Sequence, residues 1–347
     1  MLASHLEQEI NEQPDALRRL LDEEDAAVRH FADAIRRFNP AFVCIAARGT
    51  SDNAARYAQY ALGILARMPV ALAAPSIHTL YEAPPNLARA LVIGISQSGQ
   101  GLDVTRVVQD ARAQGALTIS ITNDAASPLA LAAEHHLYLH AGDEISVAAT
   151  KTYTAELTAV AMLAAALTGS EPLAADLRAL PEQIGETLAL SENIAAWAER
   201  YRYMSQFVTI GRGYNYCTAF EISLKVKELC YVTGDGYSEA DFLHGPIAQV
   251  QAGFPVIVVA PSGKTLPAML DFLAKVRERQ PELLVISNDE AAFETTRQRM
   301  PLPHHLPEWL SPIAAVIPGQ VFAMRLAQAK GHPVDRPHGL SKVTITR

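Results

Sequence analysis

Short apolar runs alternate along the chain with longer segments in which apolar residues recur at helical spacing. The run at residues 41–49 precedes a helical segment, and runs starting at Leu91 and Leu117 continue the alternation. The runs are largely apolar and do not alternate between apolar and polar residues, as expected for strands covered on both faces. The pattern predicts an α/β fold with parallel sheets and helices on both sides.

The second half of the chain repeats the plan of the first half. Three pairs of identical residues show this. Phe42 pairs with Phe207 at an offset of 165 residues, Ser98 with Ser262 at 164, and Asn123 with Asn288 at 165. Chance similarity would not keep three such pairs in step. We therefore expect two tandem doubly wound domains, each a flavodoxin-like αβα sandwich with a parallel sheet, related by internal duplication.

The duplication divides the chain into four segments. Residues 1–40 are expected to be a helical lead-in, 41–170 the first domain, 171–200 a helical connector, and 201–347 the second domain. In the lead-in, a helix is expected to start at Asp15 after Pro14. Its apolar face would be built from Leu17, Leu20, Leu21 and Val28.

Composition and charge exclude several kinds of partner. Hydrophobic residues make up 49% of the chain, and the formal charge is −8 with no cluster of Lys and Arg, which argues against a nucleic-acid surface. The longest apolar segment, residues 157–167, is too short to span a bilayer and suits a buried helix, so no membrane partner is expected. Cys44, Cys217 and Cys230 form no C-x-x-C motif, and the first residues lack a signal-peptide pattern. The isolated cysteines and the lack of a signal-peptide pattern fit a protein of the reducing cytoplasm.

A polar loop links the strand that starts at Leu91 to the next helix. It contains Ser96, Gln97, Ser98, Gly99, Gln100 and Gly101. Free N–H groups and the helix dipole at such a position can hold an anion, and Gly49, Thr50 and Ser51 repeat the chemistry after the previous strand. Ser and Gly are also ordinary turn and cap residues, so either loop alone is ambiguous. Two such loops at neighbouring strand ends favour an anion site. Neither loop matches the ATPase or dinucleotide glycine motif.

Ionisable residues gather after the first strand of the second repeat. Glu221, Lys225 and Glu228 are four and three residues apart, so they share one face of an otherwise largely apolar helix. One interpretation is a solvated ion pair. The other is a buried row in which Glu228 transfers protons and His244 acts as an acid or base.

Three further histidines suggest a metal at first sight. His135, His136 and His140 lie in a segment whose alternation suits a strand, and no zinc-type spacing of carboxylate and histidine is present. We expect no metal.

Seven motifs in order give the chain a resemblance to the sugar isomerase (SIS) family. They are "EINEQP", "ARGTSDNAA", "SQSGQGLD", "AGDEISVAATKTYTAEL", "GRGYNYCTAFEISLKVKEL", "HGP" and "RPHGLSKVTIT". More narrowly, the chain resembles the isomerase half of glutamine–fructose-6-phosphate aminotransferase and the SIS-type glucosamine-6-phosphate deaminases. The resemblance covers essentially the whole chain.

The resemblance implies a role for each matched residue. Binding of the 6-phosphate and of nearby sugar hydroxyls would fall to Thr50, Ser51, Ser96, Gln97, Ser98, Gly99 and Gln100. Val147 and Ala149 would line the sugar. Glu228 would move a proton between C1 and C2. The ring-opening His244 would reach into a neighbouring subunit, which implies a homodimer with shared active sites. Lys342 would close over the substrate, with the supporting residues Ser341, Glu221 and Lys225. No cofactor is implied.

The resemblance also sets the expected reaction. The chain departs from the synthase pattern at Gly101, at Ala149 and in the loop before His244. Its ending, "LSKVTIT", is closer to that of the deaminase and deglycase branch. Because residue 2 is Leu and no glutaminase segment precedes the isomerase unit, glutamine-dependent transfer by this chain alone is not expected. The leading hypothesis is an amino-sugar-phosphate isomerase/deaminase that converts glucosamine 6-phosphate to fructose 6-phosphate and ammonia. Alternatives are a fructosamine-6-phosphate deglycase, an aldose–ketose phosphosugar isomerase, or a non-catalytic phosphosugar-binding module.

Overall fold

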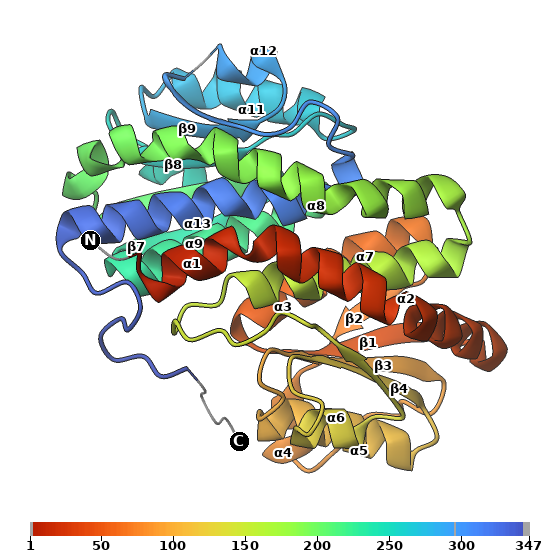
Figure 1. Ribbon diagram of the computed structural model, residues 1–347. Coiled ribbons are helices and arrows are strands. Elements are labelled where there is room, and N and C mark those ends of the chain that lie inside the picture. Colours follow the sequence, from red (N-terminus) through yellow and green to blue (C-terminus); the bar gives the residue numbers. More distant parts are fainter. Residues whose placement is uncertain (1–2, 295, 343–347) are drawn as a thin grey trace. The chain divides into compact units, whose positions relative to one another are not determined.

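The chain forms two compact units in a computed structural model that describes residues 3–294 and 296–342 (Figure 1). The first-copy unit contains residues 13–144 and 151–181 together with Ser341 and Lys342. The second-copy unit contains residues 3–12, 145–150 and the described part of 182–340. The units therefore include short segments from outside the main repeats, and the domain limits expected from the sequence remain predictions.

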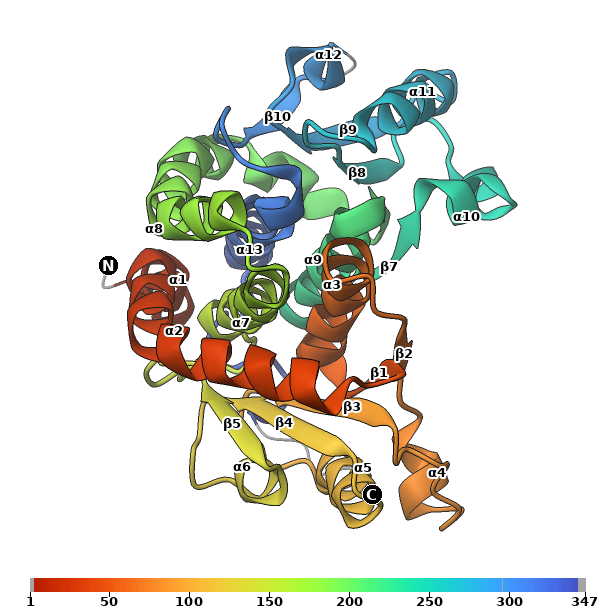
Figure 2. The same ribbon diagram turned by 90° about the vertical axis from the view of Figure 1, so that its right-hand side faces the viewer.

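The first-copy unit is a three-layer αβα sandwich. Its strands are β1 (Phe42–Ala46), β2 (Val70–Leu72), β3 (Ala90–Ser96), β4 (Leu117–Thr122) and β5 (His135–Tyr138). Its helices are α2 (Gln13–Phe38), α3 (Gly49–Leu65), α4 (Pro75–Thr79), α5 (Leu102–Ala113), α6 (Pro128–Ala132) and α7 (Lys151–Thr168). Among the described residues, the strands form one parallel sheet in the order β2-β1-β3-β4-β5. Helices α2, α3 and α7 cover one face, and α4, α5 and α6 cover the other (Figures 1 and 2).

The second-copy unit repeats this topology. Its strands are β6 (Gln206–Gly211), β7 (Thr233–Ser238), β8 (Pro255–Val259), β9 (Glu282–Ser287) and β10 (Gln298–Pro301). Its helices are α1 (His5–Asn11), α9 (Tyr216–Cys230), α10 (Glu239–Leu243), α11 (Leu266–Arg277), α12 (Glu290–Phe293) and α13 (Ser311–Lys330), with short 3₁₀ turns η1 (Glu192–Ala196), η2 (Ala198–Tyr203), η3 (Gly213–Asn215), η4 (Pro246–Gln249) and η5 (Glu308–Leu310). The residues of α8 (Glu171–Ser191) are divided between the two units. Where the structure describes it, the sheet is parallel in the order β10-β9-β8-β6-β7.

The two strand orders confirm the predicted fold class. Read from the other edge, the second order is β7-β6-β8-β9-β10, the same sequence of strands as β2-β1-β3-β4-β5. This is the doubly wound order, in which the chain changes direction across the sheet between the first and third strands. Ligands of such sheets bind at that switch point, outside the carboxyl ends of the strands. The polar loops after β1 and β3 lie at this point in the first-copy unit.

Continuous apolar strands account for the cores. In the second-copy unit, Val208 of β6 and Val258 of β8 belong to a buried cluster with Phe272 of α11. In the first-copy unit, Val92 of β3 clusters with Val108 of α5. Fully burying a side chain of this size contributes about 1.5–3 kcal/mol, so these clusters fix the helices on the sheets.

The glycine-containing stretch after α9 differs from expectation. The sequence indicated a loop, but Thr233–Ser238 forms the edge strand β7, parallel to β6. A Cβ atom at Gly234 would lie 2.1 Å from Cε1 of the Phe207 ring, and one at Gly236 would lie 2.7 Å from the backbone nitrogen of Phe220. Glycine in a strand often marks such a close approach. The glycines therefore allow this strand to pack tightly.

The lead-in and the apolar helices largely follow the sequence pattern. The lead-in forms two helices, and α2 begins at Gln13, before the predicted start at Asp15, with Pro14 in its first turn, where a missing N–H costs little. Of its predicted apolar face, Leu17, Leu20 and Val28 are buried and Leu21 is half-buried. The predicted buried apolar segment lies in α7.

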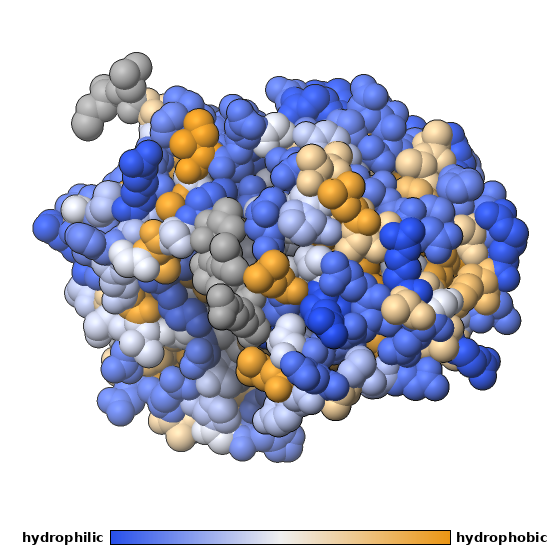
Figure 3. All heavy atoms as spheres, turned by 90° about the horizontal axis from the view of Figure 1, so that it is seen from below, coloured by the Kyte–Doolittle hydropathy of each residue, from blue (hydrophilic) through white to orange (hydrophobic). Residues whose placement is uncertain are grey.

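One described helix is long and apolar enough to cross a membrane. It spans Glu308–Lys330, and 94% of its apolar window is buried inside the protein, as in a core helix. On the face shown in Figure 3, hydrophobic residues lie scattered among hydrophilic ones.

Histidines on the edge strand β5 should make stability depend on pH. The His135 ring lies 4.9 Å from Phe31 and 5.6 Å from His30, both on α2. Burial lowers the pKa of His135 and of His136 below the usual value near 6.5. Between the lowered pKa and 6.5, the unfolded chain binds more protons than the folded chain, so the free energy of unfolding falls as pH decreases through this range. Thermal unfolding from pH 8 to 5 should show the loss, and His135→Phe should reduce the slope. An unchanged slope would contradict this assignment.

Candidate active site

The loop between β3 and α5 is a compact turn built from its own hydroxyls. Ser96 Oγ accepts a hydrogen bond from Gly99 N at 3.1 Å, and Ser98 Oγ accepts one from Gln100 N at 3.3 Å. Asn123 at the end of β4 donates its backbone N–H to the Gln97 carbonyl at 3.0 Å. Gly99 is buried, whereas the serines and glutamines remain partly exposed. The loop therefore presents polar groups beside the first turn of α5, an arrangement suited to an anion.

Gly99 is required by this turn for two separate reasons. Its φ is +63°, in the left-handed region, and an added Cβ would lie 2.1 Å from Ser127 Oγ. Gly115 has φ +84° but open space around it. Gly115→Ala should cost about 1 kcal/mol of unfolding free energy from backbone strain alone. Gly99→Ala should cost about 2–4 kcal/mol, because overpacking adds to the strain. Denaturant unfolding of both variants checks this, and equal losses would contradict the role of the Ser127 contact.

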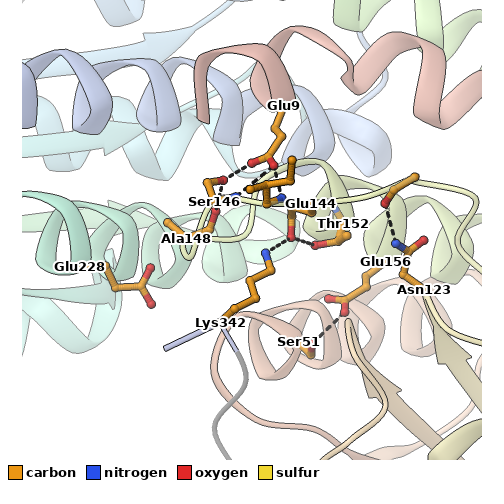
Figure 4. Close-up of polar contacts among 12 residues, drawn as sticks. Glu9, Ser51, Asn123, Glu144, Ser146, Ala148, Thr152, Glu156, Glu228 and Lys342 are labelled. Carbon is orange, nitrogen blue, oxygen red and sulfur yellow. Dashed lines mark hydrogen bonds and ion pairs between the residues drawn. The ribbon is translucent and has the colours of Figure 1, made fainter. Parts of the chain in front are cut away.

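The neighbouring loop after β1 is anchored by two acidic residues. Arg48 precedes Gly49 and donates from Nε to the fully buried Asp103 carboxylate at 2.8 Å, joining this loop to the first turn of α5. Ser51 Oγ lies 2.7 Å from Oε1 of the buried Glu156 on α7 (Figure 4). In this arrangement the Ser51 hydroxyl donates to Glu156, which leaves its lone pairs and its backbone N–H for other partners. Thr50 is half-buried at the start of α3.

Glu144 holds both the start of α7 and the tail lysine. Its buried carboxylate accepts hydrogen bonds from Thr152 N at 3.1 Å and Thr152 Oγ1 at 2.8 Å. Lys342 Nζ lies 2.8 Å from Glu144 Oε2, and Figure 4 shows the two side chains pointing toward each other. A carboxylate at a helix N-terminus is favoured by the helix dipole. The predicted lysine is thus held by an acid that the sequence reasoning did not single out, and Ser341 beside it is exposed.

The strip after Glu144 is fixed in the second-copy unit. Buried Glu9 of α1 accepts hydrogen bonds from the backbone N–H groups of Ile145 and Ser146 and from the Ser146 hydroxyl (Figure 4). Val147 N donates to the Asp335 carbonyl at 3.0 Å. Along the strip, even-numbered residues are buried and the predicted sugar-lining residues Val147 and Ala149 are half-buried. The alternation keeps both of these side chains partly accessible.

The predicted row on α9 is an ion-paired cluster. Lys225 Nζ lies 3.5 Å from Glu221 Oε1 and 2.5 Å from Glu228 Oε2. Glu221 and Lys225 are buried, whereas 23% of the Glu228 side chain is exposed. A buried ion pair is costly unless both charges are compensated, so the row differs from a solvated surface pair. Glu228 is the member of the row that a substrate can reach, which makes it the candidate for proton transfer.

Within the part of the chain that the structure describes, no hydrogen bond or ion pair joins His244 to this row. His244 is exposed just after α10, and its backbone N–H donates to the Asp241 carbonyl at 3.2 Å. Its proposed role therefore stays a prediction. Among the described residues, no group of three or more His, Cys, Asp and Glu side chains could hold a metal ion.

Sequence reasoning missed the acids that organise the site. Glu9, Asp103, Glu144 and Glu156 are all buried and accept hydrogen bonds from segments distant in the sequence or from helix ends. Glu156 had a detectable signal, since it is the one acidic residue within the apolar stretch of α7. The others lie in polar segments, where their partners cannot be inferred from spacing.

Comparisons with known proteins agree with this architecture. A family model described as "SIS domain" matches residues 42–166 and 202–296. Over 344 residues, the chain is 34% identical to the glutamine–fructose-6-phosphate aminotransferase (isomerizing) of Pyrococcus horikoshii, covering 97% of this chain and 57% of that protein. The chain therefore spans little more than half the length of this curated relative.

Solved structures are similar over nearly the whole chain. The C-terminal domain of glucosamine–fructose-6-phosphate aminotransferase from Francisella tularensis aligns with a TM-score of 0.88 and 26% identity, covering 97% of this chain and 99% of that one. A candidate phosphosugar isomerase from Silicibacter pomeroyi DSS-3 aligns with a TM-score of 0.86 and 32% identity, covering 96% and 99%. The duplicated sheets and the family match over both repeats lead to one conclusion: the chain belongs to the SIS domain family.

Proposed function

We propose that the protein is an amino-sugar-phosphate isomerase/deaminase that converts glucosamine 6-phosphate to fructose 6-phosphate and ammonia. The observation that carries the proposal is the buried Glu221–Lys225–Glu228 row, in which Lys225 Nζ lies 2.5 Å from a partly exposed Glu228 carboxylate. Similarity to phosphosugar isomerases supports the general kind of reaction. The serine-rich loop before α5 supports a phosphorylated substrate.

The proposed reaction begins with the open-chain 2-amino-aldose. Glu228 takes the proton from C2 and returns a proton to C1, while a second proton passes from the C2 amine to the C1 oxygen, so that the C1 aldehyde becomes an alcohol and the C2 amine becomes an imine. Water then adds to the imine carbon, and ammonia leaves to give the ketose. His244 would assist ring opening, and Lys342 would hold the open chain. No cofactor takes part, because the substrate is neither oxidised nor reduced overall.

Lys225 and the phosphate-binding residues would each support the proton transfer. Lys225 would hold the Glu228 carboxylate in position through their ion pair at 2.5 Å. The phosphate-binding set would fix the end of the sugar remote from the reacting carbons; it comprises Thr50, Ser51, Ser96, Gln97, Ser98, Gly99 and Gln100. Binding energy from this unreactive group positions C1 and C2 for proton transfer. Because the Ser51 hydroxyl donates to Glu156, we expect Ser51 to contribute its backbone N–H or to accept from a sugar hydroxyl.

Product analysis tests the proposal directly. Purified protein is incubated with glucosamine 6-phosphate, and both ammonia and fructose 6-phosphate are measured. We expect the two products in equal amounts, and no product from unphosphorylated glucosamine. Failure to release ammonia from any hexosamine 6-phosphate would overturn the deaminase proposal.

A second reaction, plain aldose–ketose isomerisation, is favoured by the similarity to the Silicibacter pomeroyi protein. It needs the same proton transfer without loss of nitrogen. A panel that includes a hexose 6-phosphate and a fructosamine 6-phosphate separates deaminase, isomerase and deglycase by their products. Binding without turnover of any member would support a non-catalytic phosphosugar-binding module.

We also propose that the protein works in the cytoplasm as a homodimer. The exposed position of His244 supports the second point, because a side chain that serves a neighbouring subunit must project from its own. Sedimentation of the purified protein at micromolar concentration would show a dimer, and a monomer at that concentration would contradict the shared site.

A further inference from the structure

The turn between β8 and α11 is the second-copy counterpart of the serine-rich loop. Ser262 matches Ser98 in the duplication, and the turn continues through Gly263 and Lys264 to Thr265, the N-cap of α11. Asn288 at the end of β9 accepts from Ser262 N at 2.7 Å, whereas in the first copy Asn123 donates to Gln97. An asparagine therefore holds the turn in both copies, through its backbone N–H in the first and through its side chain in the second.

A carboxylate from the same chain lies in this turn. Glu308, the first residue of η5, accepts from Thr265 N at 3.2 Å and from Thr265 Oγ1 at 3.3 Å with the same oxygen, Oε1. A Cβ atom at Gly263 would lie 2.2 Å from Glu308 Cδ. Backbone N–H, hydroxyl and close glycine approach are the features by which such turns bind phosphate. Here they surround the Glu308 side chain.

The adjoining loop of the second copy is also filled by protein side chains. At the duplication offset of 164, Tyr214 and Asn215 stand where the first copy has Thr50 and Ser51. Tyr214 is buried, and its pKa is raised to about 12 by burial and by the negative charge of Glu308. Asn215 Nδ2 donates to Ser311 Oγ at 2.7 Å. The small hydroxyl residues expected to contact a phosphorylated ligand are thus replaced by larger, internally bonded ones.

An acid that precedes the last helix of the first copy has other contacts. Glu308 lies three residues before α13, whereas Glu144 lies seven residues before α7. The Glu144 carboxylate accepts from Thr152 at the start of α7 and pairs with Lys342. The two acids therefore have different roles: Glu144 caps the following helix, and Glu308 occupies a neighbouring turn.

We propose that the β8–α11 turn is an anion cradle whose resident anion is the Glu308 carboxylate, so that the second copy binds its own chain in place of a phosphorylated ligand. The internal anion satisfies the Thr265 donors and the positive end of the α11 dipole without any ligand. If the first copy binds the phosphosugar, each chain then binds one phosphosugar molecule; this stoichiometry rests on the proposed function. The proposal of the cradle is based on the contacts of Glu308 and holds whichever sugar the protein binds.

Chemical rescue by inorganic phosphate tests the cradle. Thermal unfolding of the full chain is measured with and without phosphate, at ionic strength matched with sodium chloride, for wild type, Glu308→Ala and Glu308→Gln. The control Glu278→Ala removes an exposed acid at the other end of α11. We expect Glu308→Ala to unfold at a lower temperature than wild type and the control. Phosphate should raise its midpoint by more than it raises theirs, since an emptied cradle gains a ligand.

Two outcomes would overturn the proposal. One is the same phosphate-induced shift in Glu308→Ala as in wild type. The other is Glu308→Gln as stable as wild type, because the neutral isostere keeps the shape and removes only the anion; this comparison remains decisive if Glu308→Ala does not fold. Phosphate bound at a first-copy site would raise the unfolding midpoint of wild type as well. The quantity to compare is therefore the difference between the phosphate-induced shifts of Glu308→Ala and wild type. A protein inactive on every sugar phosphate but rescued in this way would refute the proposed function and leave the cradle intact.

Discussion

Glu228→Gln should lower turnover of the sugar phosphate by about 10²–10⁴-fold, the usual contribution of a general base. Glutamine has nearly the same size as glutamate but cannot accept the C2 proton. Lys225 keeps a second carboxylate, since Glu221 Oε1 lies 3.5 Å from its Nζ, so the fold should survive the change. The variant should still bind the phosphosugar, because Glu228 would act on C1 and C2 and not on the phosphate at the other end of the substrate.

Three measurements make this result specific. Steady-state kinetics should show the loss in kcat with little change in KM. A ligand-induced shift in the thermal unfolding midpoint should persist, which shows that binding is retained. Glu278→Gln, at an exposed position after α11, is the matched control and should keep wild-type turnover. Turnover of Glu228→Gln within a few-fold of wild type would remove Glu228 from the role of base.

Lys225→Met should lower the free energy of unfolding by about 3–5 kcal/mol, the usual cost of removing one partner of a buried ion pair. Lys225 is buried between two carboxylates, and Glu221 on its other side is fully buried. Methionine fills much of the same volume but cannot compensate either charge. Activity should fall as well, because Glu228 loses the ion pair that positions its carboxylate.

The same helix supplies the control. Lys227 is exposed on α9 and lies 3.8 Å from Asp235, an exposed pair worth about 0–1 kcal/mol. Lys227→Met should therefore change stability in urea unfolding by no more than that. Adding Glu221→Gln to Lys225→Met should recover part of the loss, because it removes the uncompensated charge. If Lys225→Met cost no more than Lys227→Met, the row would be less desolvated than its burial indicates.

The fold could be predicted because its signals are local and repeated. Apolar strands such as residues 91–96 and the helical spacing after them are visible in a short window, and the duplication shows each signal twice. The edge strand β7 was missed because its glycines normally indicate a loop. Their purpose, close contact with Phe207 and with the backbone of α9, depends on residues that are distant in the sequence.

Individual side-chain contacts of the candidate site could be predicted best where the residues share one element. Glu221, Lys225 and Glu228 lie on one helix, so spacing alone placed them together. Glu144 could not be linked to Lys342 in this way, since 198 residues separate them. The Glu156–Ser51 contact likewise joins two helices, and only the fold brings them within 2.7 Å. Spacing therefore gives the residues of one helix face, whereas pairing across elements requires the structure.

The place of Glu9 in the second-copy unit affects how this protein can be made. Glu9 holds Ile145 and Ser146, and the Asp335 carboxylate accepts from the backbone N–H groups of His5 and Leu6 at the start of α1. The unit is thus assembled from the beginning, the middle and the end of the chain. During vectorial synthesis on the ribosome, α1 emerges first and must await its last partners. Severing the gene between the repeats would leave α1 and residues 145–150 with the first repeat, so the second repeat made alone would lack two stretches of its own unit.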